Sequence, residues 1–132
     1  MPIRKQILIV DDDPEIREML EITLADEGYE VLSASDGAAA LALLEHHCPG
    51  LILLDMRMPV MDGWAFARAY AARPGPHAPL LVMTAAVDAT RWAREVDACA
   101  SVAKPFDLNR LLEKIAVHAL PPPGGEPAAS PT

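Results

Sequence analysis

The sequence has 132 residues, of which 52% are hydrophobic and 23% are charged, so we expect one globular domain with a core of ordinary size. Acidic residues outnumber basic residues by 19 to 11, and the net charge of -8 disfavours direct binding to nucleic acid or to anionic membranes. No apolar run approaches the roughly 18 residues of a membrane span and no signal peptide is evident, so we expect action in the cytoplasm.

Buried strands and amphipathic helices are predicted to alternate along the chain. The apolar run Gln6–Val10 predicts a first strand, and Asp13 and Pro14 are residue types that begin a helix, with Gly28 as its C-cap. The inward face of this helix is expected to hold Ile16, Met19, Leu20 and Leu24, with Glu15, Arg17, Glu18 and Glu21 in water.

The alternation continues through the rest of the chain. Further strands are predicted over Tyr29–Ala34, Leu51–Leu54, Leu80–Met83 and Ser101–Ala103. The second helix is predicted to run from Asp36 to the stop at Cys48, Pro49 and Gly50, with Ala38, Leu41, Ala42 and Leu44 inward. Later helices are predicted over about Trp64–Ala72, along the residues Ala89, Trp92, Ala93 and Val96, and after the cap Asp107 with Leu108, Leu111, Leu112 and Ile115 inward.

Five strand–helix units favour an α/β fold with a doubly wound parallel sheet of the flavodoxin-like type, (βα)5, in the strand order 2-1-3-4-5. Residues 1–120 are expected to form this domain. The Pro-rich segment 121–132 is expected to be a disordered tail or a linker.

Polar residues stand where the predicted strands end. Asp11 and Asp12 follow the first strand, Asp55 the third, Thr84 the fourth and Lys104 the fifth. Such sheets bind ligands beyond the carboxyl ends of their strands, so we expect these side chains to meet. Carboxylates without nearby His or Cys favour Mg²⁺, and a dication beside a carboxylate suggests phosphoryl chemistry with Asp55 as nucleophile. Asp13 is explained as a helix cap.

Several other features are better explained by packing than by function. Adjacent residues do not converge on one metal ion, so His46, His47 and Cys48 are not expected to bind zinc. Core or loop packing accounts for Met56, Met58, Met61, Trp64 and Trp92. We expect Cys48 and Cys99 to be buried or idle thiols. The chain has no Gly-rich phosphate loop, so a nucleotide enzyme is not supported.

Four segments in register resemble the receiver domain of bacterial two-component response regulators, over about residues 5–118. They are ILIVDDDPEIREML, LILLDMRMPVMDG, LLVMTAA and VAKPF. The resemblance implies that Asp55 accepts a phosphoryl group from the phosphohistidine of a sensor histidine kinase or a histidine phosphotransfer protein. It implies that Mg²⁺ is held by Asp11, Asp12, Asp55 and the backbone carbonyl of Arg57. Thr84 and Lys104 would contact the phosphoryl group, Pro59 and Gly63 would shape the loop, and Pro105 would follow a cis peptide.

The departures from the family concern how phosphorylation is read out. Ser101 stands where the family usually carries Tyr or Phe, which works together with the threonine as a switch. Asp97 replaces a common Gly, and Cys99 and Ala100 replace a common polar pair. We therefore expect weak coupling to the face formed by the fourth helix, fifth strand and last helix. The signal would pass mainly through the loop after Thr84 and the helix that holds Trp92.

Three functions are compatible with these features. The first is a switch module that takes a phosphoryl group from its partner kinase onto its own aspartate and then binds a downstream protein. Such a module is not an enzyme in the turnover sense. The second is the N-terminal regulatory part of a longer DNA-binding response regulator. The third is a phosphatase that uses Asp55 as nucleophile on a small phosphate ester.

Overall fold

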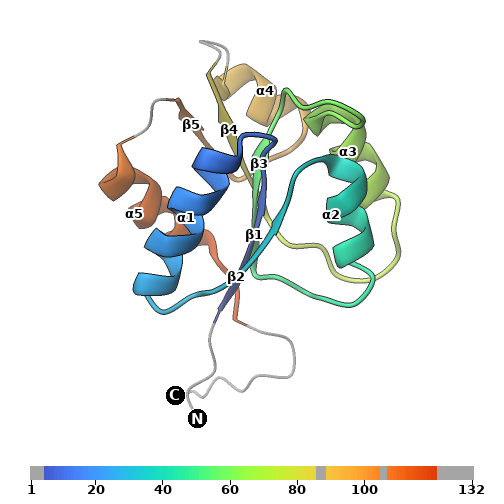
Figure 1. Ribbon diagram of the computed structural model, residues 1–132. Coiled ribbons are helices and arrows are strands. Elements are labelled where there is room, and N and C mark those ends of the chain that lie inside the picture. The colour runs from blue at the N-terminus through green and yellow to red at the C-terminus, as the bar shows by residue number, and fades with distance from the viewer. Residues whose placement is uncertain (1–4, 86–88, 105–106, 122–132) are drawn as a thin grey trace.

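The computed structural model describes residues 5–85, 89–104 and 107–121, where strands and helices alternate (Figure 1). The strands are β1 (Gln6–Val10), β2 (Glu30–Ala34), β3 (Leu51–Asp55), β4 (Leu80–Thr84) and β5 (Ala100–Ala103). The helices are α1 (Pro14–Asp26), α2 (Gly37–Leu43), α3 (Gly63–Ala71), α4 (Ala89–Glu95) and α5 (Leu108–His118). None of the helices in these ranges is long and apolar enough to span a membrane. The expected cis peptide at Pro105 and the Pro-rich segment from residue 122 onward lie outside the described residues.

All neighbouring strands pair in parallel, and their order β2-β1-β3-β4-β5 confirms the predicted sheet. The order reverses between β1 and β3, where Val10 lies opposite Leu54. Further along, Asp55 lies opposite Met83 and Thr84 lies opposite Ala103. The carboxyl ends of these four strands therefore stand at nearly the same level, which is the arrangement that places side chains following them beside one another.

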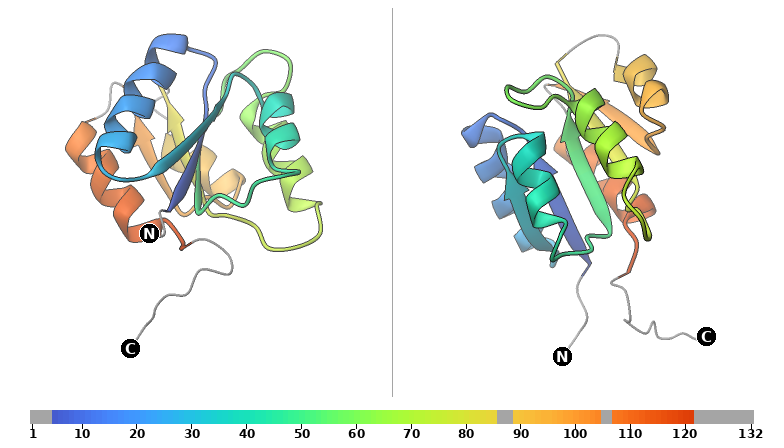
Figure 2. Two further views of the ribbon diagram at one scale, coloured as in Figure 1. Left: turned by 60° about the horizontal axis from the view of Figure 1, so that its bottom comes forward. Right: turned by 90° about the vertical axis from the view of Figure 1, so that its right-hand side faces the viewer.

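Helices cover both faces of the sheet (Figure 2). Successive residues of a strand belong alternately to two hydrophobic clusters, one on each face. Ile7 and Ile9 of β1 pack with residues of α1 and α5, whereas Leu8 and Val10 pack with residues of α2, α3 and α4. This division follows from the period of two along a strand. It explains why the central strands have apolar residues at every position rather than at alternate ones.

Aspartates cap four of the helices. The side chain of Asp13 accepts a hydrogen bond from Glu15 N at 2.9 Å, as predicted for the start of α1. The caps of α2, α3 and α5 are Asp36, Asp62 and Asp107, each of which also accepts a backbone N–H. Because each of these helices follows a strand, the caps help to fix the loops that leave the carboxyl edge of the sheet.

Some details of burial and length differ from the predictions. Leu20 and Leu24 are buried, but Met19 is 38% exposed because it lies beside the row of inward residues that α1 presents. α2 ends at Leu43 rather than near Cys48, and its buried positions are Gly37 and Ala40, so Ala38 and Ala42 face water. The C-cap of α1 is Glu27, and Gly28 follows it with a φ of +94°, a left-handed conformation that favours glycine. The thiols Cys48 and Cys99 are free and exposed, so of the two expected explanations, burial or idleness, burial does not hold.

Gly50 makes a close backbone contact that holds the end of the described chain. Its N–H donates to Gln6 O at 2.7 Å, and Leu120 N donates to Gly50 O at 2.9 Å. A Cβ at residue 50 would lie 2.1 Å from the carbonyl oxygen of Leu120, so no side chain fits without moving that segment.

We expect Gly50→Ala to lower the free energy of unfolding by about 2–3 kcal/mol, the usual cost of overpacking. Urea unfolding would measure it. The matched control is Gly75→Ala, where a Cβ meets nothing within 4 Å and only the positive φ of +94° is strained, at a cost of about 1 kcal/mol. A larger loss for the Gly75 variant would contradict the assigned contact.

Candidate metal centre

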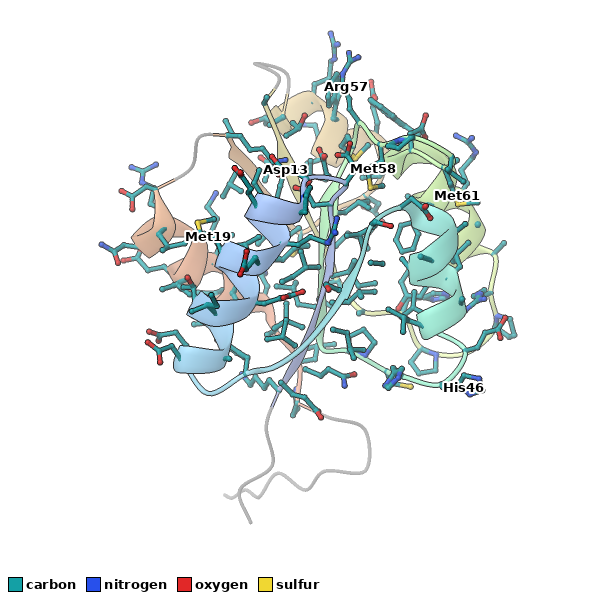
Figure 3. The ribbon with its side chains drawn as sticks, in the orientation of Figure 1. Asp13, Met19, His46, Arg57, Met58 and Met61 are labelled. Carbon is teal, nitrogen blue, oxygen red and sulfur yellow. The ribbon has the colours of Figure 1, made fainter. Side chains whose placement is uncertain are left out.

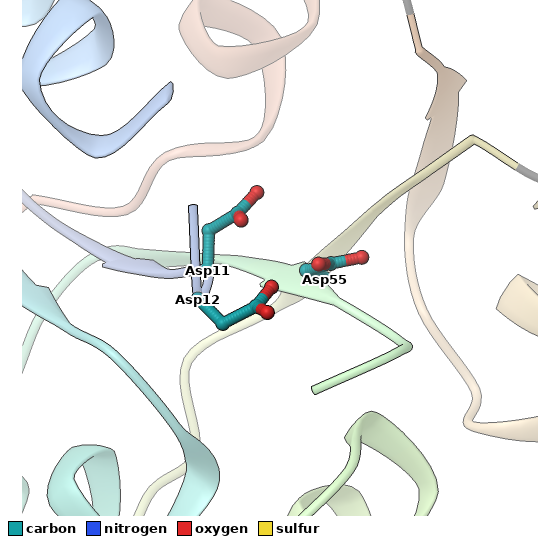
Figure 4. A group of neighbouring side chains, drawn as sticks. All are labelled: Asp11, Asp12 and Asp55. Carbon is teal, nitrogen blue, oxygen red and sulfur yellow. The ribbon is translucent and has the colours of Figure 1, made fainter. Parts of the chain in front are cut away.

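Three carboxylates meet at the point where the strand order reverses. Asp11 and Asp12 follow the last residue of β1, and Asp55 is the last residue of β3. Each offers one oxygen atom, and these oxygens lie within 4.8 Å of one another. Figure 4 shows the side chains of Asp11 and Asp12 projecting on the side where Asp55 lies. The sequence prediction that these residues converge is confirmed by this geometry.

The two inner carboxylates are held in place by backbone groups. Asp11 is 0% exposed and Asp55 is 5% exposed, while Asp12 faces solvent. Asp13 N donates to Asp11 Oδ1 at 2.9 Å, and Arg57 N approaches Asp55 Oδ1 at 3.4 Å. These contacts orient oxygens whose other lone pairs remain available to a ligand.

Lys104 joins the carboxylates from the other side of the site. Its Nζ lies 2.7 Å from Asp11 Oδ2 and 3.5 Å from Asp55 Oδ2. Lys104 N also donates to Thr84 O at 2.8 Å, so the turn after β5 is fixed against the end of β4. Burial lowers the pKa of Lys104, but the hydrogen bond to Asp11 and the charges of Asp11 and Asp55 outweigh it and raise the pKa above its ordinary value. The ammonium is therefore charged at neutral pH.

Burial, followed by the charge of Asp11, raises the pKa of Asp55 from 3.8 to about 6. Lys104 and the Arg57 N–H act in the opposite direction, and Asp12 adds a smaller repulsion. One ammonium therefore does not compensate three carboxylates in the metal-free protein. The arrangement favours a further cation or another source of positive charge.

The raised pKa of Asp55 predicts how the stability of the metal-free protein depends on pH. A group whose pKa is higher in the folded state stabilises the fold at pH below about 4, and this contribution is lost as the pH rises through about 6. In EDTA, Asp55→Asn should therefore gain stability relative to the parent chain between pH 4 and 7, by up to about 3 kcal/mol. Urea unfolding of both proteins across this range measures the difference. A difference that does not vary with pH would contradict the pKa assignment.

The donor set fits a hard dication. All candidate side-chain ligands are oxygens, two of them are nearly fully buried, and the cluster carries excess negative charge. Oxygen ligands of this kind suit Mg²⁺. In the described part of the chain this is the group of acidic, His or Cys side chains that meets the geometry of a metal site. Figure 3 shows His46 at the opposite end of the molecule from Asp13 and Arg57, so the sequence His46-His47-Cys48 is remote from the centre.

The remaining predicted residues come from β4, the loop after β3 and β5. Thr84 ends β4 and is 1% exposed, and Arg57 is exposed in the loop that follows β3. Ser101 lies within β5, opposite Val82, and is not brought to the carboxylates. Residues 86–88 of the loop after Thr84, which is expected to carry the signal, lie outside the described residues.

One residue of the centre was missed by the sequence prediction. Arg17 was expected to face water, yet it is half-buried, and its Nη1 donates to the carbonyl oxygen of Asp11 at 2.7 Å. It thereby braces the backbone that carries the acidic pair. A charged residue one turn into an amphipathic helix gives no sequence signal for this role, because its long stem can bury while the head finds a carbonyl.

The methionines and tryptophans pack as predicted. Met56 is buried and Met58 and Met61 pack against the cluster on the α2, α3 and α4 face. Trp92 is buried in the same cluster, and Trp64 packs against it.

Comparisons with known proteins agree with this fold. A family model of the response regulator receiver domain matches residues 7–116. Response regulator MprA from Mycobacterium sp. (strain KMS) is 38% identical over 117 residues, covering 87% of this chain and 50% of the relative. DNA-binding response regulator MtrA from Mycolicibacterium smegmatis is 35% identical over 115 residues, covering 86% of this chain and 50% of the relative. The chain thus spans about half the length of these curated relatives.

Solved structures give the same result. The chemotaxis response regulator CheY4 of Vibrio cholerae is similar with a TM-score of 0.79 and 33% identity, covering 86% of this chain and 98% of that one. Response regulator TrrA of Thermotoga maritima, solved in complex with Mg²⁺-BeF, is similar with a TM-score of 0.76 and 33% identity, covering 86% and 97%.

Proposed function

Because the chain belongs to the response regulator receiver domain family, we propose that it accepts a phosphoryl group on Asp55 from the phosphohistidine of a sensor histidine kinase or histidine phosphotransfer protein. One observation carries this proposal. A nearly buried Asp55 carboxylate lies within 4.8 Å of oxygens from Asp11 and Asp12, and its Oδ2 lies 3.5 Å from Lys104 Nζ. Such a cluster of charges suits the stabilisation of a transferring phosphoryl group.

Each side chain of the site has its own role in the proposed phosphoryl transfer. An oxygen of Asp55 attacks phosphorus, the new O–P bond forms as the P–N bond of the phosphohistidine breaks, and the imidazole nitrogen keeps the electron pair. Lys104, held charged by its two carboxylate partners, is positioned to neutralise an oxygen of the phosphoryl group. We assign the hydroxyl of Thr84 to a second oxygen, because it ends the strand beside β3.

We assign Mg²⁺ to Asp11, Asp12, Asp55 and the backbone carbonyl of Arg57. When bound, the ion would supply Lewis-acid neutralisation of phosphoryl oxygens that an acidic cluster would otherwise repel. The matching solved relative TrrA is described with Mg²⁺-BeF, which supports this assignment. We propose that the chain hydrolyses only the acyl phosphate formed on its own Asp55. The protein is then a phosphoacceptor rather than a turnover enzyme.

The proposal also includes two protein partners and the compartment in which they meet the chain. The donor is a histidine kinase or phosphotransfer protein, and the phosphorylated chain would bind a downstream protein. We propose the cytoplasm as the compartment of both steps. The acidic net charge of -8 supports a protein target over direct contact with nucleic acid.

The test is the stoichiometry of labelling by acetyl phosphate. We expect at most one phosphoryl group per chain, formed with Mg²⁺ and not in EDTA, and no sustained release of phosphate at many equivalents per protein. Labelling that proceeds equally in EDTA would refute the proposed site. Steady hydrolysis over many turnovers would instead favour a phosphatase with Asp55 as nucleophile.

A second candidate is the regulatory part of a longer DNA-binding response regulator. It is favoured by the finding that the chain spans about half of its curated relatives, one of which is named a DNA-binding response regulator. A reading frame that continues beyond Thr132 into a helix-turn-helix segment decides for this candidate. A stop codon after Thr132 decides for a stand-alone receiver.

A further inference from the structure

The loop that follows β3 reaches α4 through the side chain of Arg57. Its guanidinium carbon lies 5.1 Å from the centre of the Trp92 ring, which is a cation–π distance. Trp92 is only 6% exposed, so the core holds the ring against which the guanidinium stacks. An otherwise exposed loop residue thus has a fixed partner on a helix.

Trp92 extends this contact to α3 and along α4. The Trp64 and Trp92 rings meet edge to face with 4.8 Å between their centres. Trp64 Nε1 donates to Glu95 Oε1 at 2.9 Å. We call Arg57, Trp64, Trp92 and Glu95 the tryptophan cluster. It joins the β3–α3 loop, α3 and α4 in one chain of contacts between polar and aromatic side chains.

The fifth strand has no side chain suited to a similar task. Its sequence is ASVA, and Ser101 is only partly buried. The carbonyl of Ser101 accepts a hydrogen bond from Lys114 Nζ at 2.7 Å, which ties β5 to α5. A serine cannot fill and vacate a pocket as a large ring does, so β5 has no large two-state side chain.

We infer that Arg57 is a positioning residue: its stacking on Trp92 holds the backbone of the metal-binding loop and couples occupancy of the site to α4. This rests on the proposed function, which assigns the Arg57 carbonyl to the ion. A ligand on that carbonyl fixes the orientation of the peptide group and with it the direction of the side chain. Since the ring is anchored in the core, the change is passed to Trp92 and then to Trp64 and Glu95. By reciprocity, whatever binds α4 and shifts Trp92 alters the affinity for the ion.

The chain holds two tryptophans, and both belong to the cluster, so two indole N–H resonances report on it alone. The experiment is a titration of the folded, uniformly ¹⁵N-labelled protein with Mg²⁺, followed by beryllium fluoride. The amides of Asp12 and Arg57 report occupancy of the site. The indole resonances of Trp64 and Trp92 report the cluster. We expect all four signals to shift with one midpoint.

The variants separate the link from the site. Trp92→Phe keeps an aromatic face under the guanidinium, and the Trp64 indole should still shift with Mg²⁺. Trp92→Leu removes the face without changing any charge, and the Trp64 indole should lose most of its shift while the Asp12 amide still responds. The Mg²⁺ dissociation constant of the Leu variant should exceed that of the Phe variant about twofold to fivefold, the range expected for an exposed cation–π contact. Arg57→Gln, at an exposed position, gives the same test without altering the core.

Each outcome is decisive. Site amides that ignore Mg²⁺ in the parent chain would overturn the proposed metal site and the link with it. Site amides that shift while both indoles stay still would overturn the link alone. A Trp64 indole that responds fully in both Trp92→Leu and Arg57→Gln would also overturn it, because the signal would then travel by another route.

Discussion

Asp55→Asn should reduce labelling by acetyl phosphate to background, which is the largest effect expected of any substitution in this chain. The amide cannot act as the attacking carboxylate, yet it has nearly the same shape. It also removes the buried negative charge, which burial and then the charge of Asp11 disfavour and whose pKa they raise to about 6. The variant should therefore be folded and inert. Labelling can be measured as a mass increase of the intact protein after incubation with Mg²⁺ and acetyl phosphate.

The matched control for this loss is Asp13→Asn. Asp13 lies in the same acidic run, but its side chain caps α1 by accepting a hydrogen bond from Glu15 N at 2.9 Å. Asparagine caps helices as well as aspartate does, so labelling should persist in this variant. Undiminished labelling of Asp55→Asn would remove the acceptor assignment, whereas parallel loss in both variants would point to general damage of the acidic run.

Mg²⁺ should stabilise the protein strongly, because it binds the folded carboxylate cluster and scarcely the unfolded chain. At a concentration 100 times its dissociation constant the gain in free energy of unfolding is about 2.7 kcal/mol. For a domain of this size that gain raises Tm by roughly 10 °C. Thermal unfolding in EDTA and in increasing Mg²⁺, followed by circular dichroism, measures the shift.

Asp12→Ala separates a specific site from a general salt effect. Asp12 is exposed, so its removal leaves the core intact, takes away one proposed ligand and lessens repulsion in the metal-free protein. The variant should melt at or above the parent chain in EDTA and lose most of the gain from Mg²⁺. Identical melting temperatures with and without Mg²⁺ in the parent chain would rule out the site.

The fold could be predicted because several independent signals agree. The central strands, such as Leu51–Asp55, are buried at every position, and continuous apolar runs of this length are typical of strands covered on both faces. Asp13, Asp36 and Asp107 mark where three of the helices begin. The position of Asp11, Asp12 and Asp55 followed from those boundaries, since parallel strands bring their carboxyl ends to one edge.

The contacts that could not be predicted are made by side chains that can bind several different partners. The brace from Arg17 to Asp11 O and the stacking of Arg57 on Trp92 both use long cationic side chains that are also at home in water. Val60 is a different case, because its backbone has a φ of 69°, which β-branched residues disfavour. Its backbone forms a tight turn, in which the Met61 N–H donates to the Pro59 carbonyl at 2.7 Å.

The anchoring of Leu120 on Gly50 determines how the domain can be presented in experiments. Gly50 also bonds to Gln6, the first residue of β1, so the chain passes Leu120 at the amino ends of the strands. The carboxylates stand at the opposite, carboxyl ends. An affinity tag or a surface coupling placed after this point would therefore leave Asp55 facing away from the support. Kinase binding could then be measured on an immobilised domain without obstruction of its phosphoacceptor end.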